Sequence, residues 1–214
     1  MKNTPKNKKF ISFEGIEGVG KSTNIQYVAH LLEKHTQSYI LTREPGGTPL
    51  AEEIRKLLLT HTQDAEKIWP DTEILLLYAG RMQHVQEVIF PALSQEKWVL
   101  CDRFFDATFA YQGGGRKVDM ARIESLHHWA LGDFKPATTF IFDAPPEVGL
   151  ARIQKRGDLD RIEQEKIDFF HAVRQVYLQR AQADPKRFIV IDTNRDLPAI
   201  QLDLKLAIDK ILVA

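Results

Sequence analysis

The nine residues GIEGVGKST, at positions 15–23, fit the template G-x-x-x-x-G-K-S/T of a phosphate-binding loop. The run KFISFEG at 9–15 is short and apolar and ends in glycine, which is typical of a β-strand. After Lys21, apolar residues recur at helical spacing. A glycine loop between a strand and a helix directs backbone N–H groups and the positive helix end at phosphate. The stretch therefore predicts a nucleotide site in an α/β protein.

The side chains of this loop predict how the phosphates of ATP would be held. Lys21 would pair with the β- and γ-phosphates, and the hydroxyl of Ser22 would bind Mg²⁺. Thr23 is predicted to pack within the helix, although it belongs to the template. The alternative is a glycine turn that binds no ligand. The residues expected against the ATP phosphates are Gly15, Glu17, Gly18, Val19, Gly20, Lys21, Ser22 and Thr23.

Further strands predict the fold class. Short β-rich runs recur along the chain and are separated by stretches of helical periodicity, and a last amphipathic helix begins near Leu197. Strands that alternate with helices favour a parallel sheet covered on both faces. We therefore expect an α/β fold whose five-stranded parallel sheet is built from the first run and from the runs at 38–42, 98–102, 139–143 and 187–192.

Length and charge limit the possible functions. The chain has 214 residues, with 29 basic and 29 acidic side chains, so its net charge does not attract nucleic acid or an anionic membrane. It has one cysteine, Cys101, and no long apolar run that could span a membrane, which together favour the cytoplasm. We expect residues 1–8 to be a disordered basic tail and residues 9–214 to form a single domain.

Two aspartates follow predicted strands and are candidate ligands for Mg²⁺. Asp102 follows WVLC and Asp143 follows TFIF. We favour Asp102, because Arg103 comes next and both side chains would leave the same strand end, where ligands bind in parallel sheets. The alternative is a local ion pair at the strand end. The chain contains no N-K-x-D sequence, which argues against a GTPase.

Arginines near other predicted strand ends indicate a second anionic substrate. Arg43 lies in TREPGGT, Arg81 in LLYAGRMQ and Arg103 in DRFFDATFAYQGGGR. Arginine binds phosphate through paired N–H groups, which a lysine cannot reproduce. Each arginine taken alone is more often a solvated surface residue, so the prediction depends on all three lying just after or near turns beside strand ends.

In order and spacing, these segments resemble the bacterial thymidylate kinases over nearly the whole chain. The segments that carry the resemblance are FEGIEGVGKST, TREPGGTPLAEEIRKLLL, DRFFDATFAYQGGGR, LGDFKP and RGDLDRIEQE. The resemblance implies a nucleoside monophosphate kinase fold. It also implies transfer of the γ-phosphoryl group of ATP to thymidine 5′-monophosphate (dTMP), with Mg²⁺, in a cytoplasmic homodimer.

The resemblance also implies roles for individual residues toward dTMP. Arg103 would bind the monophosphate, Arg43 would help to position it, and Arg81 would reach both this region and O4 of thymine. Thr108 and Gln112 correspond to positions near the base.

The acceptor's sugar and base raise two further expectations. Tyr111 corresponds to a tyrosine whose ring crowds the 2′ position of the sugar, which would exclude ribonucleotides. Leu77 occupies a position at which the family often stacks an aromatic ring on thymine. The next residue, Tyr78, points about 100° away on a helix and cannot replace that ring. We expect weaker base recognition unless Phe104 or Phe105 compensates.

The resemblance offers an explanation for Glu17. Family members with no arginine in the phosphate loop carry a catalytic arginine in a lid, here predicted at 152–161, which contains Arg152, Lys155, Arg156 and Arg161. We choose Arg156 as the catalytic arginine and expect Arg152 to assist with the ATP phosphates. Glu17 would then contact the 3′-hydroxyl of dTMP or a magnesium-bound water. The predicted catalytic residues are Glu17, Lys21, Arg103 and Arg156.

Two other functions remain open from the sequence. One is a kinase for another deoxynucleoside monophosphate, and the other is a non-catalytic ATP-binding switch. The second group of arginines argues against a switch, which needs no acceptor site. An apolar helix from about Asp71 to Pro91 would be covered either by a second subunit, as the family resemblance favours, or by the same domain.

Overall fold

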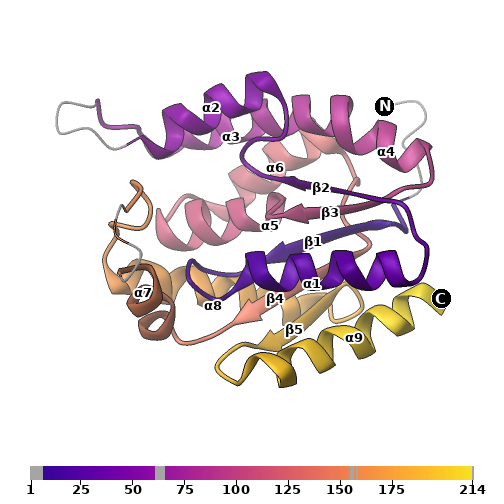
Figure 1. The fold of residues 1–214 in the computed structure, drawn as a ribbon. Helices are drawn as coiled ribbons and strands as arrows, with labels where there is room; N and C mark the ends of the chain where they lie inside the picture. Colours follow the sequence, from indigo (N-terminus) through magenta and orange to yellow (C-terminus); the bar gives the residue numbers. More distant parts are fainter. Residues whose placement is uncertain (1–6, 61–65, 155–156, 158, 214) are drawn as a thin grey trace.

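The computed structural model describes residues 7–60, 66–154, 157 and 159–213. In this part of the chain a parallel sheet has the strand order β2-β3-β1-β4-β5. Its strands all point the same way in Figure 1. The predicted α/β fold with a five-stranded parallel sheet is confirmed. The strands are β1 (Phe10–Glu14), β2 (Tyr39–Arg43), β3 (Trp98–Asp102), β4 (Thr138–Asp143) and β5 (Phe188–Asp192).

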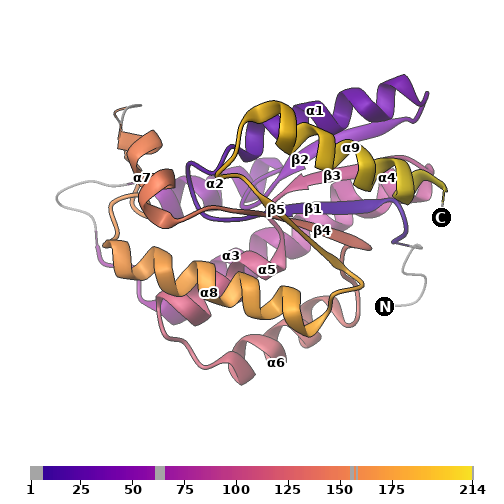
Figure 2. The same ribbon diagram turned by 90° about the horizontal axis from the view of Figure 1, so that it is seen from below.

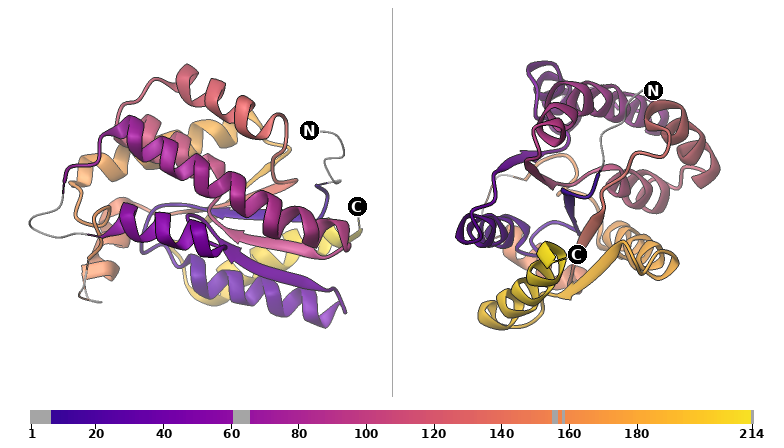
Figure 3. Two further views of the ribbon diagram at one scale, coloured as in Figure 1. Left: turned by 90° about the horizontal axis from the view of Figure 1, so that it is seen from above. Right: turned by 90° about the vertical axis from the view of Figure 1, so that its right-hand side faces the viewer.

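The helices cover both faces of the sheet. In Figure 2, α1 and α9 lie on one face, and α3, α5, α6 and α8 lie on the other. Figure 3 shows α2 alongside α3, which it contacts. None of the helices in the described residues is long and apolar enough to cross a membrane. Their bounds are α1 (Lys21–Lys34), α2 (Pro49–Leu59), α3 (Pro70–His84), α4 (Phe90–Ser94), α5 (Phe105–Thr108), α6 (Met120–Leu131), α7 (Pro146–Gln154), α8 (Ile167–Ala183) and α9 (Leu197–Val213).

Two wide helical turns interrupt the α-helical path. The π-helical segment η1 (Val85–Ile89) joins α3 to α4, so the helical path runs to Ser94, past the predicted end at Pro91. Proline has no N–H to donate, and a π-turn lets the chain pass such a point without breaking. The second segment, η2 (Phe109–Gly115), follows α5 and carries Tyr111 and Gln112.

The strand register brings polar side chains to one edge of the sheet. β1 lies between β3 and β4, and Phe13 is level with Asp102. The central strands are buried on both faces, as expected in a parallel sheet with helices on each side. Their last residues, Glu14, Asp102 and Asp143, therefore end at the same edge, where the loops of the site begin.

Candidate active site

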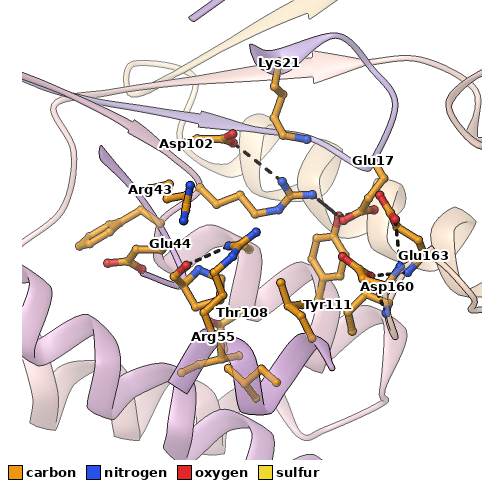
Figure 4. Close-up of a pocket in the computed structure, with 18 of the residues that line it drawn as sticks. Glu17, Lys21, Arg43, Glu44, Arg55, Asp102, Thr108, Tyr111, Asp160 and Glu163 are labelled. Atoms are coloured by element: carbon orange, nitrogen blue, oxygen red, sulfur yellow. Dashed lines mark hydrogen bonds and ion pairs between the residues drawn. The ribbon is translucent and has the colours of Figure 1, made fainter. Parts of the chain in front are cut away.

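A cavity of about 520 Å³ opens at the carboxyl ends of β1 and β3. Its wall includes the phosphate loop from Glu17 to Thr23 without Val19, the end of β3, the face of α3 that carries Leu77 and Arg81, and Tyr111 and Gln112 from η2. In Figure 4, Lys21 and Asp102 lie toward one end of the cavity, and Glu44 and Thr108 lie toward the other. Groups from distant parts of the sequence thus meet in one cavity.

The phosphate loop depends on glycines at two close approaches. Gly15 has φ of 135° and Gly18 has φ of 72°, both in a region that other residues rarely adopt. A Cβ atom would lie 2.4 Å from the Phe142 carbonyl oxygen at Gly15 and 2.1 Å from the Gly149 carbonyl oxygen at Gly18. Gly15 and Val19 do not line the cavity, and the Val19 side chain is buried in the core. Any contact of Val19 with phosphate would therefore come from its backbone.

Lys21, the first residue of α1, is buried and folds back on the loop. Its Nζ donates hydrogen bonds to the carbonyl oxygens of Gly15 at 3.0 Å and Ile16 at 2.7 Å. Burial disfavours the ammonium and, together with the charge of Arg103, lowers the pKa of Lys21 to about 8. A polyanion beside Lys21 would favour its charged form.

The next two residues, Ser22 and Thr23, are exposed and line the cavity. The prediction that Thr23 packs within the helix is therefore wrong. After Lys21, the buried residues of α1 continue with Asn24, Ile25 and Val28, and Thr23 is not among them.

Glu17 turns away from the loop toward Arg103 and Tyr111. Arg103 Nη2 donates to Glu17 Oε1 at 2.6 Å and is 2.9 Å from the Tyr111 hydroxyl, which itself donates to Glu17 at 2.8 Å. Arg103 has φ of 65°, a left-handed backbone conformation that is unusual for residues other than glycine. Such outliers cluster at functional sites, and here the conformation brings the guanidinium to the cavity.

Glu14, at the end of β1, holds the backbone turn that follows Arg103. Its Oε1 accepts from the Phe104 backbone N–H at 2.7 Å, and its Oε2 accepts from the Tyr177 hydroxyl at 2.8 Å. Burial, and then the nearby Asp106 carboxylate, raise the pKa of Glu14 to about 8.

Arg81 is buried and largely occupied by protein acceptors. It donates to Glu44 Oε2 at 2.6 Å, to Thr108 Oγ1 at 3.1 Å and to the Phe104 carbonyl at 3.3 Å. His84 Nδ1 lies 3.0 Å from the other oxygen of Glu44. A guanidinium has five N–H groups, so these contacts in the described chain leave two for a ligand.

Arg43 and Arg55 line the same wall. Arg43 pairs with Glu52 at 2.9 Å, and about half of its side chain is exposed. Arg55 donates to the Pro45 carbonyl at 2.9 Å. Arg55 was not predicted as a site residue, because on α2 its position in the sequence is equally typical of a solvated helix face.

The two strand-end aspartates have different partners. Both oxygens of Asp143 accept from Arg174, at 2.6 and 2.8 Å, which occupies this carboxylate. Asp102 Oδ1 is buried and has no hydrogen-bond partner in the described chain, and its nearest cation, Arg103 Nη1, is 3.8 Å away. Asp102 also lines the cavity, whereas Asp143 does not.

Leu77 and Tyr78 point in different directions. Leu77 lines the cavity, whereas Tyr78 is 2% exposed and packs with its ring 4.7 Å from the Arg81 guanidinium carbon. Phe104 lines the cavity and Phe105 does not. No aromatic ring thus occupies the Leu77 position, and Phe104 is the one of the two phenylalanines that reaches the wall.

Of the arginines in the predicted lid, the structure describes Arg152 and Arg161. Arg152, on α7, donates to the Gly18 carbonyl at 3.2 Å and so reaches the phosphate loop. Arg161 donates to the Leu58 carbonyl at 2.7 Å and pairs with Glu73 on α3. Arg156, the predicted catalytic arginine, lies outside the described residues.

Comparisons with known proteins agree with this geometry. The family model described as thymidylate kinase matches residues 13–203. The chain belongs to the thymidylate kinase family. It is 53% identical over 203 residues to a thymidylate kinase of Pseudomonas putida, covering 95% of this chain and 96% of that protein. It is 49% identical over 197 residues to that of Janthinobacterium, covering 92% and 94%.

A solved structure extends the likeness to three dimensions. The crystal structure of thymidylate kinase from Ehrlichia chaffeensis superposes with a TM-score of 0.74 at 33% identity, covering 94% of this chain and 97% of that one. The predicted resemblance to the thymidylate kinase family is confirmed, and so is its fold.

Several wall residues of this thymidylate kinase family member were not singled out from the sequence. Glu44 lies inside the quoted segment TREPGGT, but nothing there indicated that it would hold Arg81. Glu73 and Asp160 occur in stretches typical of helix ends and loops. Glu73 is placed by a contact across the chain, with Gln112, 39 positions later at 2.6 Å. Asp160 is held by local hydrogen bonds with Ile162 and Glu163.

Proposed function

We propose that this thymidylate kinase family member transfers the γ-phosphoryl group of ATP to dTMP, giving dTDP and ADP. The observation that carries the proposal is one cavity with the phosphate loop at one end and Leu77, Thr108 and Gln112 at the other, linked by the contacts of Arg103. Two nucleotides bound end to end in such a cavity would hold the reacting groups together, which replaces a bimolecular encounter by a positioned one.

The ATP phosphates would be held by the loop N–H groups, by Lys21 and by Arg152, whose side chain reaches Gly18. Ser22 and Thr23 at the start of α1 face the same end of the cavity. Because Lys21 gives two hydrogen bonds to the loop itself, it is preorganised and needs little rearrangement when ATP binds.

The pKa of Lys21 leads to a prediction for pH dependence. Lys21 is charged below its pKa of about 8 and neutral above it, so the loop loses its cation as the pH rises through 8. We expect kcat/KM for ATP to fall above about pH 8, measured at saturating dTMP. In the Lys21→Arg variant, whose cation does not titrate, this limb should disappear even if the activity is lower.

A second group near the site has a similar pKa. Glu14 also titrates near pH 8, so a limb that persists in Lys21→Arg but disappears in Glu14→Gln would assign the titration to Glu14 and contradict the Lys21 prediction.

The dTMP phosphate would be bound by Arg103, with Arg43 assisting at the exposed rim. Arg81 would use its remaining N–H groups toward O4 of thymine, next to Thr108 and Gln112. The Tyr111 ring would crowd the 2′ position of the sugar. Glu17, already directed at Arg103 and Tyr111, would accept a hydrogen bond from the 3′-hydroxyl of dTMP or from a magnesium-bound water.

Mg²⁺ is part of the proposal, and the donor set fits it. Among the described residues no three His, Cys, Asp or Glu side chains gather as a metal cage. Mg²⁺ in kinases usually takes one or two protein ligands and phosphate oxygens instead. Asp102, with its unpartnered buried oxygen, and Ser22 would supply these ligands. The ion would neutralise charge on the transferring phosphates.

Replacing Asp102 by asparagine tests this assignment. We expect the half-saturating Mg²⁺ concentration to rise by roughly tenfold to a hundredfold, because a neutral amide is a weaker ligand for this cation. Activity titrated with Mg²⁺ at fixed ATP measures the change, and Asp143→Asn is the matched control. An unchanged Mg²⁺ requirement in Asp102→Asn would contradict a metal role for Asp102.

The catalytic cation of the proposal is Arg156 in the lid at 152–161. In its favour, Arg152, the first residue of this segment, lies on α7 and reaches the phosphate loop at Gly18. An arginine over the γ-phosphoryl group would stabilise charge that develops in the transition state. Lid closure would also exclude water and protect ATP from hydrolysis.

We further propose a cytoplasmic homodimer. In favour of a dimer, Leu75 on α3 is 60% exposed and Trp129 on α6 is 73% exposed, and these two helices contact each other. Exposed apolar groups on adjacent helices favour a protein partner. Analytical ultracentrifugation of the full chain decides between monomer and dimer.

The proposed reaction is tested by mixing the protein with ATP, Mg²⁺ and single nucleoside monophosphates and measuring ADP. We expect dTMP to be the preferred acceptor. Preference for another deoxynucleoside monophosphate would favour a different kinase. Formation of no ADP, or at best of a little ADP that no acceptor stimulates, would favour a non-catalytic ATP-binding switch.

A further inference from the structure

The base end of the cavity contains a buried carboxylate, Glu73 of α3, which the proposed reaction does not use. Its side chain is 2% exposed. One oxygen accepts from Gln112 Nε2 at 2.6 Å, and the other accepts from Arg161. Arg116 Nε lies 3.7 Å from the first oxygen. With both oxygens engaged by partners from two other segments, η2 with the adjoining Arg116 and the loop of Arg161, the carboxylate is held in one orientation.

A carboxylate accepts hydrogen bonds and donates none, so it can pair with the NH₂ group of the Gln112 amide but not with its oxygen. The NH₂ group must face Glu73, and the oxygen must face the other way. This orientation follows from the chemistry of the pair, which removes the usual ambiguity of a glutamine amide.

The remaining oxygen of Gln112 is left as an acceptor without a donor. Gln112 is 4% exposed and lines the cavity together with Leu77, Arg81 and Thr108. Its Oε1 is buried and has no hydrogen-bond partner in the part of the chain that the structure describes. A buried acceptor of this kind is costly unless a ligand satisfies it.

We infer that Glu73 is a positioning residue that fixes the Gln112 amide, so that the site selects a pyrimidine with an N–H donor at N3. This inference rests on the proposed function, since it concerns the base of the acceptor. Thymine has a hydrogen on N3, whereas cytosine has a lone pair there. Gln112 Oε1 would accept a hydrogen bond from N3–H of thymine. Opposite cytosine, the same oxygen would face the lone pair of N3, and the two would repel each other.

The discrimination depends on the carboxylate rather than on Gln112 alone. A free glutamine amide can rotate by 180° and present either its oxygen or its NH₂ group, so it suits both bases. An acceptor-only neighbour prevents this rotation. A glutamine at position 73 could itself donate or accept, and it would therefore release the constraint on Gln112 at nearly unchanged volume.

The test compares dTMP with 5-methyl-dCMP, which differ at N3 and position 4 of the base but keep the same methyl group and sugar. For the full chain with ATP and Mg²⁺, we expect Glu73→Gln to lower the ratio of the two kcat/KM values by about tenfold or more, the size of one hydrogen bond to a buried group. The KM for ATP should stay within about twofold.

Two further variants distinguish positioning from general damage. Glu165→Gln removes another carboxylate partner of Arg116 but does not contact Gln112, and it should leave the ratio unchanged. In a Gln112→Ala background, Glu73→Gln should have no further effect on the ratio, because its action requires the amide. An independent effect of Glu73→Gln in that background would overturn the inference.

The inference and the proposed function fail in different ways. An unmodified protein that forms no ADP with dTMP would contradict the proposed function. An active protein whose Glu73→Gln variant leaves the ratio of the two kcat/KM values unchanged overturns the inference alone. If Glu73→Gln does not fold, Glu73→Asp keeps the negative charge but is shorter by one methylene, which draws the carboxylate away from Gln112. It should lower the same ratio, and an unchanged ratio would again overturn the inference.

Discussion

Replacing Arg156 by alanine is expected to lower kcat by roughly 10³ to 10⁵ while the KM for dTMP changes little. An arginine that contacts the transferring phosphoryl group acts mainly in the transition state, where charge is spread over its oxygens. Loss of such a contact therefore lowers kcat and kcat/KM together. Steady-state kinetics with ATP and dTMP both varied measure the two effects separately.

The comparison variant is Arg152→Ala. Its side chain reaches the Gly18 carbonyl at the loop, so we expect mainly a higher KM for ATP. Weaker binding in Arg156→Ala with kcat unchanged would contradict a catalytic role for Arg156. A large kcat effect in Arg152→Ala alone would move the assignment to that residue.

The second large effect is expected for Arg103→Ala. Arg103 is the cation that contacts both Glu17 and Tyr111, and its side chain is 18% exposed. Removing it would take away the proposed partner of the dTMP phosphate and leave Glu17 partly buried beside an incoming anion. We expect kcat/KM for dTMP to fall by roughly 10² to 10³, in line with the loss of a buried, hydrogen-bonded charge pair. Isothermal titration with dTMP and steady-state kinetics measure the loss.

Arg122→Ala provides the matched control for Arg103→Ala. Arg122 pairs with Asp71 on an exposed surface, at 65% side-chain exposure, and surface ion pairs of this kind contribute little. Its kinetics should stay within twofold of the unmodified protein. A KM for dTMP that stays within threefold in Arg103→Ala would contradict the proposed phosphate contact.

The fold was predictable because its signals are local. The run WVLCD predicted β3 at its observed bounds, and the apolar spacing after Lys21 predicted α1. The strand predicted at 38–42 is shifted by one residue to Tyr39–Arg43, since an edge strand has fewer buried side chains to mark its ends. The helix expected to stop near Pro91 continues, because the π-turn of η1 was not visible in the periodicity.

The site was only partly predictable from the sequence. Asp102 ends β3, Arg103 follows it, and Lys21 comes after β1 and the phosphate loop, so their arrival at one edge of a parallel sheet could be inferred. The partners that hold the arginines could not. Glu44 meets Arg81 across 37 positions, and Glu73 meets Arg161 across 88, and no local pattern specifies such pairs.

The left-handed backbone at Arg103 has a consequence for how this protein would respond to stabilising selection. A residue other than glycine in that conformation carries a steric cost of about 1–2 kcal/mol, so glycine at position 103 would relieve backbone strain in this turn. Such a change would also delete the guanidinium. Screens that select for heat resistance alone should therefore favour inactive variants at position 103, because the backbone there favours glycine whereas turnover requires arginine.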